Sequence, residues 1–223
     1  MGEVKLPAHI RGVIFDLDGT LLDSMGVWQQ IDRDFFAKRG ITVPDSYAAS
    51  IAHMSFRECA DYTIAHFHLN ETPEDVMQEW RDMAWDAYAN RLSFKPGALA
   101  CLKRLKTAGL KLALATAGEE RTARAAVRHN GAEPLFDAFV TLADVTRGKG
   151  FPDIYWEAAR RMGLPPADCA VAEDILAGIR GAKDGGFYAI GVYDAANTAE
   201  HEAMKALADA WLEAFDTLTP AAG

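Results

Sequence analysis

VIFDLDGTLLDS, residues 13–24, carries the clearest structural signal in this chain. A run of apolar residues leads into two aspartates, Asp16 and Asp18, with no basic residue beside them. Near-continuous apolar strands are typical of parallel sheets that are buried on both faces. Side chains alternate along a strand, so both aspartates point to one side, at the carboxyl end where open α/β sheets bind ligands. Gly19 then allows the chain to turn sharply.

Two carboxylates this close together need a counter-charge. Repulsion between them would raise the pKa of one carboxyl unless a cation joins them. Mg²⁺ is the most plausible partner, because hard divalent cations prefer oxygen ligands. A solvated acidic turn is the commoner reading of such a pair taken alone. A calcium-binding EF-hand loop is excluded, because Gly19 follows Asp18 directly and apolar residues flank the pair.

The rest of the chain shows two kinds of pattern. Residues 25–92 carry apolar residues at helical spacing, whereas strands and helices alternate further on. Such alternation predicts right-handed crossovers and a parallel sheet covered by helices. We therefore expect an α/β fold with a doubly wound parallel sheet. Residues 1–22 and 95–223 would form its Rossmann-like core, and residues 23–94 a helical cap inserted after the first strand.

The expected elements follow from turn residues and periodicity. Thr72 and Pro73 mark a helix start, with Asp75 closing a capping-box pair. The aromatic residues Trp80, Trp85 and Tyr88 are expected in the core of the helical block. Helices are predicted near 27–38, 98–107, 120–129, 152–162 and 199–207, with a further one ending at 185–186. Strands are predicted at 110–116, 137–142, 169–174, 187–193 and near 210–215.

Three later strands also end in residues that carry chemistry. LALAT ends at Thr116, which is followed by the small residues Ala117 and Gly118. A hydroxyl and exposed backbone N–H groups at such a position can hold a phosphate oxygen. TRGKGFPD places Lys149 between glycines, and CAVAED ends in a further pair of acids, Glu173 and Asp174. Each signal has an ordinary structural explanation when it is taken alone, but a parallel sheet would bring all of them to one edge.

These motifs resemble the haloacid dehalogenase superfamily, in its branch of phosphatases and β-phosphoglucomutase-like enzymes with a helical cap. They are DLDGTLLDS (16–24), LALATAG (112–118), GKGFPD (148–153) and AEDILAGIRGAKDGGFYAIGV (172–192). The resemblance implies a Mg²⁺-dependent phosphatase that hydrolyses small phosphate monoesters, such as sugar or nucleoside phosphates, through an aspartyl-phosphate intermediate. It also implies that a small phosphorylated metabolite is the natural partner.

The resemblance assigns a role to each strand end. Asp16 would be the nucleophile, and Asp18 would protonate the leaving group and then activate water. Thr116, the N–H of Ala117 and Lys149 would hold the phosphate oxygens. The expected Mg²⁺ ligands are Asp16, the backbone carbonyl of Asp18, Asp174 and, directly or through another ligand, Glu173.

The cap loop HMSFRECA (53–60) resembles the loop that family members point at their substrates. Arg57 is our candidate there for a contact to a polar or anionic leaving group. The alternative reading is a solvated arginine on a helix surface.

Two other functions remain open from the sequence. β-Phosphoglucomutase-like mutases carry a histidine in the hinge after the first motif, and Trp28 stands at that position here, which favours a phosphatase over a sugar phosphomutase. A phospho-accepting receiver module also uses acids, a hydroxyl and a lysine. Receivers, however, are about half as long and lack a helical cap.

Composition limits the partners. The formal net charge is −9 and the pI is about 5.1, so nucleic acid and anionic membranes are not expected to bind. Three separated cysteines and the lack of CxxC favour a reducing compartment over a disulfide framework or a zinc site. MGEVKLPAHI lacks the apolar run of a signal peptide. We expect a cytoplasmic protein that is a monomer or a small homo-oligomer.

Overall fold

The computed structural model describes residues 2–51 and 54–221. The chain divides into two compact units: a core unit, Met1–Ser24 with Leu92–Gly223, and a helical unit, Met25–Arg91. None of the helices in the described ranges is both long enough and apolar enough to cross a membrane.

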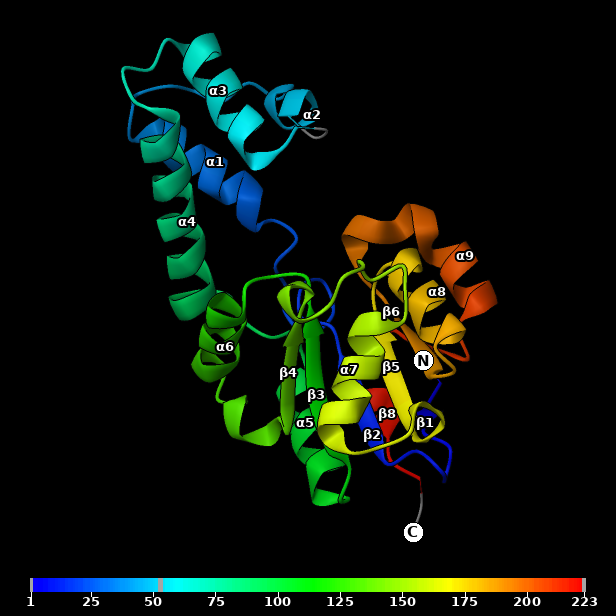
Figure 1. The fold of residues 1–223 in the computed structure, drawn as a ribbon. Helices are drawn as coiled ribbons and strands as arrows, with labels where there is room; N and C mark the ends of the chain where they lie inside the picture. Colours follow the sequence, from blue (N-terminus) through cyan, green and yellow to red (C-terminus); the bar gives the residue numbers. More distant parts are fainter. Residues whose placement is uncertain (1, 52–53, 222–223) are drawn as a thin grey trace. The chain divides into compact units, whose positions relative to one another are not determined.

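The core unit is built on a six-stranded parallel sheet in the order β4-β3-β2-β5-β6-β7 (Figure 1). From β2 the chain builds outward through β3 to β4, and then returns to the other side of β2 through β5. The carboxyl end of β2 is therefore the topological switch point, where doubly wound folds bind ligands. The predicted fold class is confirmed. The strands are β2 (Gly12–Phe15), β3 (Lys111–Thr116), β4 (Ala138–Thr141), β5 (Cys169–Glu173), β6 (Tyr188–Val192) and β7 (Ala210–Leu212).

Burial explains why the central strands read as continuous apolar runs. All residues of β2 and β5 are buried, and Ile14 pairs with both Ala113 and Val171. Helix α7 packs on β2, β3 and β4, and α8 packs on β5 and β6. The helices of this unit are α5 (Ala98–Thr107), α6 (Glu120–His129), α7 (Asp153–Met162), α8 (Leu176–Asp184) and α9 (His201–Leu207).

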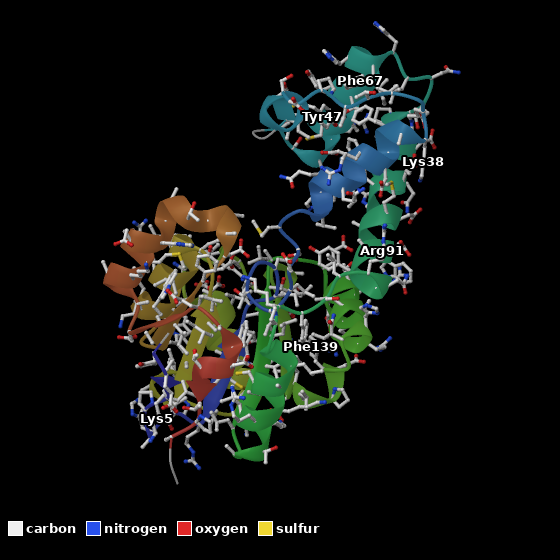
Figure 2. All side chains as sticks on the ribbon, turned by 180° about the vertical axis from the view of Figure 1, so that it is seen from behind. Lys5, Lys38, Tyr47, Phe67, Arg91 and Phe139 are labelled. Atoms are coloured by element: carbon white, nitrogen blue, oxygen red, sulfur yellow. The ribbon has the colours of Figure 1, made fainter. Side chains whose placement is uncertain are left out.

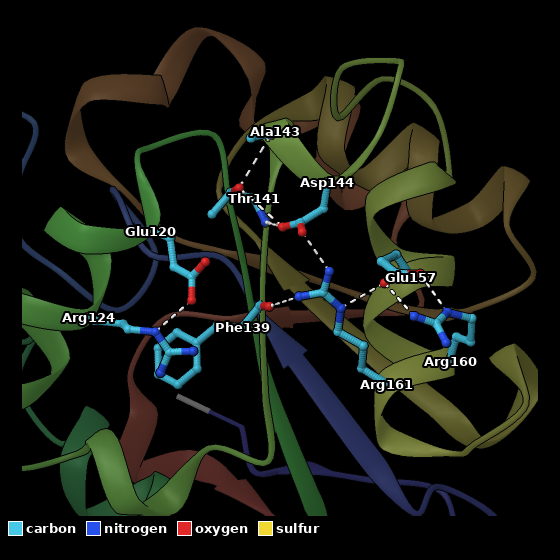
Figure 3. Close-up of polar contacts among 9 residues, drawn as sticks. All are labelled: Glu120, Arg124, Phe139, Thr141, Ala143, Asp144, Glu157, Arg160 and Arg161. Atoms are coloured by element: carbon cyan, nitrogen blue, oxygen red, sulfur yellow. Dashed lines mark hydrogen bonds and ion pairs between the residues drawn. The ribbon is translucent and has the colours of Figure 1, made fainter.

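Strand β4 is an outer strand, and Arg161 of α7 satisfies one of its free carbonyls (Figure 3). The guanidinium donates to Phe139 O at 2.5 Å, to Asp144 Oδ1 at 2.6 Å and to Glu157 Oε1 at 2.7 Å. Asp144 in turn accepts from the N–H of Thr141 at 2.8 Å, which caps the short 3₁₀ helix η2 (Leu142–Asp144). The carboxyl end of β4 is thus fixed just before the loop that carries Lys149.

The helical unit consists of α1 (Val27–Ala37), α2 (Tyr47–Ile51), α3 (Phe56–Phe67) and α4 (Pro73–Asn90). Its core is aromatic, and Phe36 lies 5.1 Å from Tyr47 and 4.5 Å from Phe67 between ring centroids. Figure 2 shows Tyr47 and Phe67 on the side of this unit formed by α2 and α3. Aromatic pairs at these separations stabilise a core beyond the apolar area that they bury.

Helix α4 begins as the sequence predicts. Thr72 is the N-cap, Pro73 occupies the first turn, and Thr72 and Asp75 form a reciprocal capping box. The expectation that Trp85 belongs to the core is wrong, because its side chain is 39% exposed whereas Trp80 is 4% exposed. The buried stripe of α4 runs through Val76, Trp80, Met83 and Ala87, and Trp85 lies off that face.

Several elements were not predicted, among them α2 and α3, and α3 takes up residues 56–60 of the segment expected to be a loop. A two-stranded parallel sheet pairs β1 (Val4–Lys5) with β8 (Leu218–Thr219), elements too short to give a sequence pattern. The last helix begins two residues later than expected, because a 3₁₀ segment, η4 (Ala195–Glu200), precedes it.

Candidate active site

The first carboxylate of the site lies directly after β2. The N–H of Asp16 donates to Ala172 O at 3.0 Å, which extends the pairing of β2 with β5, and Asp16 is 5% exposed. Gly19 has φ 76°, a left-handed conformation that glycine adopts without strain. The sharp turn is then closed by the N–H of Gly19 donating to Leu22 O at 3.1 Å.

Lys149 reaches this carboxylate from a loop far away in sequence. Its ammonium donates to Asp16 Oδ1 and, at 2.7 Å, to Glu173 Oε1, and the residue is 9% exposed. Arg147, which precedes the lysine, forms an ion pair at 2.6 Å with Asp153, which follows it. The reading of Lys149 as an ordinary surface lysine is therefore excluded.

Glu173 and Asp174 complete an acidic cluster at the end of β5. Asp16, Glu173 and Asp174 each offer one carboxylate oxygen, and these three oxygens lie within 4.8 Å of one another. All three residues are buried. The structure thus brings together the two strand ends that the sequence predicts to share a metal ion.

Three further residues hold these acids, and the sequence did not identify them as site residues. Tyr155 of α7 donates its hydroxyl to Glu173 Oε1 at 2.8 Å. Thr20 donates to Asp174 Oδ1 at 3.1 Å, and Asn197 donates to Asp174 Oδ2 at 2.7 Å. Thr20 is part of the first motif, which could have identified it as a site residue. Tyr155 and Asn197 belong to segments that contain no motif.

Burial dominates the electrostatics of the cluster. It raises the pKa of Glu173 to about 7, although Lys149 opposes the shift. Burial also raises the pKa of Asp174 to about 8, and the charges of Asp16 and Glu173 add to the shift. Burial by itself would lower the pKa of Lys149, but the attraction of Asp16 and Glu173 outweighs it and holds that pKa above its usual value. The ammonium is therefore charged, and the carboxylates lack a sufficient counter-charge.

Glycines in α8 allow the cluster to pack. A Cβ at Gly178 would lie 2.5 Å from Cδ of Glu173, and one at Gly181 would lie 2.2 Å from the backbone oxygen of Lys149. No side chain fits at such distances. The two glycines of AGIRG therefore let helix α8 approach both Glu173 and the lysine loop.

The hydroxyl predicted to bind phosphate lies at the end of β3. Thr116 is 1% exposed, and its Oγ1 accepts from the N–H of Gly118 at 3.0 Å. A Cβ built on Gly118 would lie 3.4 Å from Thr116 Oγ1 and 4.0 Å from Asp18 Oδ2. The carboxylate of Asp18 therefore faces the turn that contains Thr116, Ala117 and Gly118. The parallel pairing of β3 with β2 places this turn beside the end of β2.

Arg57 lies in the helical unit, on the first turn of α3. It forms ion pairs with Asp61 at 3.3 Å and with Glu74, and its side chain is 51% exposed. Ser55 is the N-cap of this helix, while His53, at the start of the loop that we singled out, lies outside the described residues. A role for Arg57 in substrate selection stays a prediction.

The acidic cluster fits a divalent cation. Three buried carboxylates face one ammonium, and burial and the repulsion of neighbouring charges raise the pKa values of Glu173 and Asp174. Oxygen donors of this kind are those that Mg²⁺ prefers. Asp16, Asp174 and the backbone carbonyl of Asp18 would hold the ion, with Glu173 at its side.

Comparison with known proteins gives the family. The model of the haloacid dehalogenase-like hydrolases matches residues 10–186. The chain belongs to this family. The match spans the core motifs at Asp16, Thr116, Lys149 and Glu173, and the helical unit between them.

Individual relatives match this hydrolase over most of its length. Hexitol phosphatase A of Escherichia coli (strain K12) is 32% identical over 84% of this chain and 85% of its own. The phosphorylated carbohydrates phosphatase of Thermotoga maritima is 27% identical, over 79% and 82% of the two chains. A crystal structure of a candidate β-phosphoglucomutase from Thermotoga maritima superposes with a TM-score of 0.83 at 25% identity, over 93% and 96%. The prediction of a phosphoric monoester hydrolase of this family is confirmed.

Proposed function

We propose that this hydrolase is a Mg²⁺-dependent phosphatase of small phosphorylated sugars and related metabolites. One observation carries the proposal. A buried lysine, Lys149, is bonded to Asp16 at the switch point of the sheet, and Asp174 contributes a further carboxylate to the same cluster. Transfer of a phosphoryl group to an aspartate requires a nucleophilic carboxylate, a cation and an acidic pocket.

The reaction proceeds in two steps. A carboxylate oxygen of Asp16 attacks the phosphorus, the bond from phosphorus to the ester oxygen breaks, and Asp18 gives its proton to the departing oxygen. Water then attacks the aspartyl-phosphate, and Asp18 takes the proton back. Inorganic phosphate leaves, and both carboxyl groups return to their starting state.

The surrounding residues orient the phosphate and balance its charge. The hydroxyl of Thr116, the N–H of Ala117 and the ammonium of Lys149 bind the non-bridging oxygens and stabilise the charge spread over them. Bound Mg²⁺ supplies positive charge that offsets the repulsion between a carboxylate and a phosphate dianion. Burial of Lys149 and Asp174 strengthens each of these interactions, because the local dielectric constant is low.

The substrate class is supported by the relatives. Hexitol phosphatase A and the phosphorylated carbohydrates phosphatase bear names that specify phosphate esters of sugars or polyols. We extend this class to the present chain, with nucleoside phosphates as the next candidates. Arg57, in the helical unit, is the proposed contact to a polar or anionic leaving group.

A sugar phosphomutase is the second candidate. β-Phosphoglucomutase of Bacillus subtilis is 29% identical over 82% of this chain. Trp28 argues against this candidate, because mutases that resemble β-phosphoglucomutase carry a histidine at this position. In this structure the Trp28 side chain is 48% exposed and packs edge-on against Phe56 at 6.1 Å between ring centroids.

A panel of phosphorylated sugars, polyols and nucleosides tests the proposal. Purified protein is assayed for inorganic phosphate with Mg²⁺ and with EDTA, and the organic products are followed by phosphorus NMR. A phosphatase releases phosphate only with Mg²⁺. A mutase instead gives an isomeric sugar phosphate with little free phosphate and needs a bisphosphate activator. Stable labelling of Asp16 without turnover would contradict both and favour a receiver-type module.

A further inference from the structure

The segment after β6 contacts the loop that carries Asp174 at two points. Asn197 Nδ2 donates to Asp174 Oδ2 at 2.7 Å and to the backbone oxygen of Asp174 at 3.1 Å. Three residues on, Glu200 Oε2 accepts from the N–H of Leu176 at 2.8 Å. Figure 1 shows this segment, drawn in orange between β6 and α9, beside α8. The η4 segment therefore forms hydrogen bonds with both ends of the turn that leads from β5 into α8.

The Asn197 contact leaves little freedom to the Asp174 carboxylate. One of its oxygens accepts from Thr20 at 3.1 Å and the other from Asn197, and the residue is 2% exposed. The backbone of η4 departs from helical geometry at Asn197, with φ −105° and ψ 21°. Two donors on opposite oxygens fix the plane of a carboxylate, because both hydrogen bonds prefer the plane of the acceptor group.

The start of η4 is anchored to the turn after the two motif aspartates. Asp194 accepts from the N–H of Ala196 at 2.8 Å and forms an ion pair with Lys95 at 2.8 Å. Lys95 also donates to the backbone oxygens of Gly19 and Tyr193. The Asp194 side chain is 6% exposed and that of Lys95 15%, so solvent screens this pair weakly. The N–H of Asn197 donates to Asp194 O at 3.2 Å, so a continuous polar path joins the Gly19 turn to Asp174 through Lys95, Asp194 and Asn197.

We infer that Asn197 is a positioning residue, which holds the Asp174 carboxylate in the orientation that binds the divalent cation. The inference rests on the proposed function, because it gives Asp174 a metal to bind. Residues that orient metal ligands typically change metal affinity about 10–100-fold when they are mutated. Without Asn197, the Asp174 carboxylate keeps one hydrogen bond and can rotate about its terminal torsion. Binding of the cation must then also order this carboxylate, which lowers the affinity for the ion.

Direct metal binding in the absence of substrate tests this role. Wild-type protein, Asn197→Ala and Asn197→Ser are titrated with Mn²⁺, with free ion detected by electron paramagnetic resonance, and their thermal midpoints are measured. The matched control is Asn130→Ala. Asn130 also uses its amide in the core unit, donating to Leu92 O at 3.0 Å and Ala126 O at 2.9 Å and accepting from Phe94 N at 2.8 Å.

The expected result separates orientation from stability. Both Asn197 variants should raise the Mn²⁺ dissociation constant about tenfold or more, whereas Asn130→Ala should lower the thermal midpoint and leave that constant within about twofold. Equal Mn²⁺ affinity of wild type and the Asn197 variants would overturn the inference and leave the proposed function standing. No Mn²⁺ binding by wild-type protein would overturn the proposed metal site, and the inference with it.

Discussion

At the scale of single residues, charge balance governs the cluster around Lys149. Its ammonium is shared between Asp16 and Glu173, and Asp174 lies close to both acids. Burial denies these groups the water that would otherwise screen them. Each charge in such a cluster acts on the others at close range, so we expect single substitutions here to affect chemistry more than folding.

Asp16→Asn should lower turnover at least about a thousandfold, because an amide cannot act as the nucleophile in place of a carboxylate. The side chain keeps its size, so the thermal midpoint should change little. Phosphate release under saturating Mg²⁺ measures the effect. Asp184→Asn, the same change at an exposed position in the core unit, should retain wild-type activity. Comparable activity of the two variants would remove Asp16 from the mechanism.

At the scale of elements, helix α8 and strand β5 determine the position of Glu173. Gly178 faces the Glu173 carboxyl at a distance that excludes a Cβ, and α8 continues past it to the lysine loop. A glycine inside a helix normally costs about 1 kcal/mol relative to alanine. Here the close approach of α8 to the acids offsets that cost.

Gly178→Ala should therefore reduce activity, although alanine is the better helix former. The new methyl group displaces Glu173 from Lys149 and Tyr155, and we expect a loss of at least about tenfold in kcat/KM. Ala177→Gly is the matched control. It removes about 1 kcal/mol of helix propensity at an exposed neighbouring position and should lower the thermal midpoint without reducing kcat/KM. The prediction fails if Gly178→Ala is both more stable and fully active.

Helix α1 of the helical unit contains a carboxyl whose pKa predicts a pH dependence. Burial raises the pKa of Asp32 from 3.8 to about 6, with Arg33 opposing the shift. The folded state therefore binds its proton more tightly than the unfolded state. The free energy of unfolding should fall as pH rises from about 4 to about 6, because ionisation is more favourable in the unfolded chain.

Asp32→Asn should remove that dependence. The variant should be more stable than wild type by about 1–2 kcal/mol at pH 7.5, and the gain should shrink towards pH 4, where wild-type Asp32 is protonated. Thermal unfolding of both proteins across this range gives the difference. Asp45→Asn, at an exposed position in the same unit, is the control. A gain that stays constant from pH 4 to pH 7.5 would contradict the assignment.

At the scale of the whole molecule, a bound cation should couple the site to global stability. The acidic cluster joins β2 and β5, which are adjacent in the middle of the six-stranded sheet. An ion that binds only the folded state stabilises it by about 2.7 kcal/mol at a concentration one hundred times its dissociation constant. The effect reports metal binding without relying on catalysis.

Saturating Mg²⁺ should raise the thermal midpoint by about 5–10 °C for a chain of this size, and EDTA should reverse the shift together with activity. Asp174→Asn should abolish most of the shift, because it removes one of the carboxylates proposed to bind the ion. Addition of Na⁺ at equal ionic strength controls for general screening. Activity that survives EDTA would count against the metal.

The division into two units suggests that substrate selection and chemistry can be separated. Arg57→Ala should change the ranking of sugar and nucleoside phosphates by about tenfold in kcat/KM and leave hydrolysis of p-nitrophenyl phosphate within about twofold. Arg33→Ala is the control, since Arg33 is also exposed in the helical unit and bonded to a neighbouring side chain, Gln30. Equal losses on all substrates would remove the specificity role of Arg57.

Local sequence signals account for many of the helices and strands of this protein. The predicted start of α4 and the predicted bounds of α5 and α6 agree with the structure, because caps and glycines act on the residues next to them. The apolar runs before Asp16, Thr116 and Glu173 likewise predicted buried parallel strands whose ends meet. Short elements such as β1 and β8 were not predicted, because a strand of two residues shows no periodicity.

How the acids are held depends on packing between segments that are far apart in the sequence. Lys149 meets Asp16 across 133 residues of sequence, and Thr20 meets Asp174 across 154. Tyr155 and Asn197 lie in ordinary helical and turn sequences, and their hydrogen bonds depend on how α7 and η4 pack beside β5. Sequence pattern records the environment of a residue along its own segment. The direction and partner of a buried polar side chain are set by the segments packed against it, and these become known only when the chain is folded.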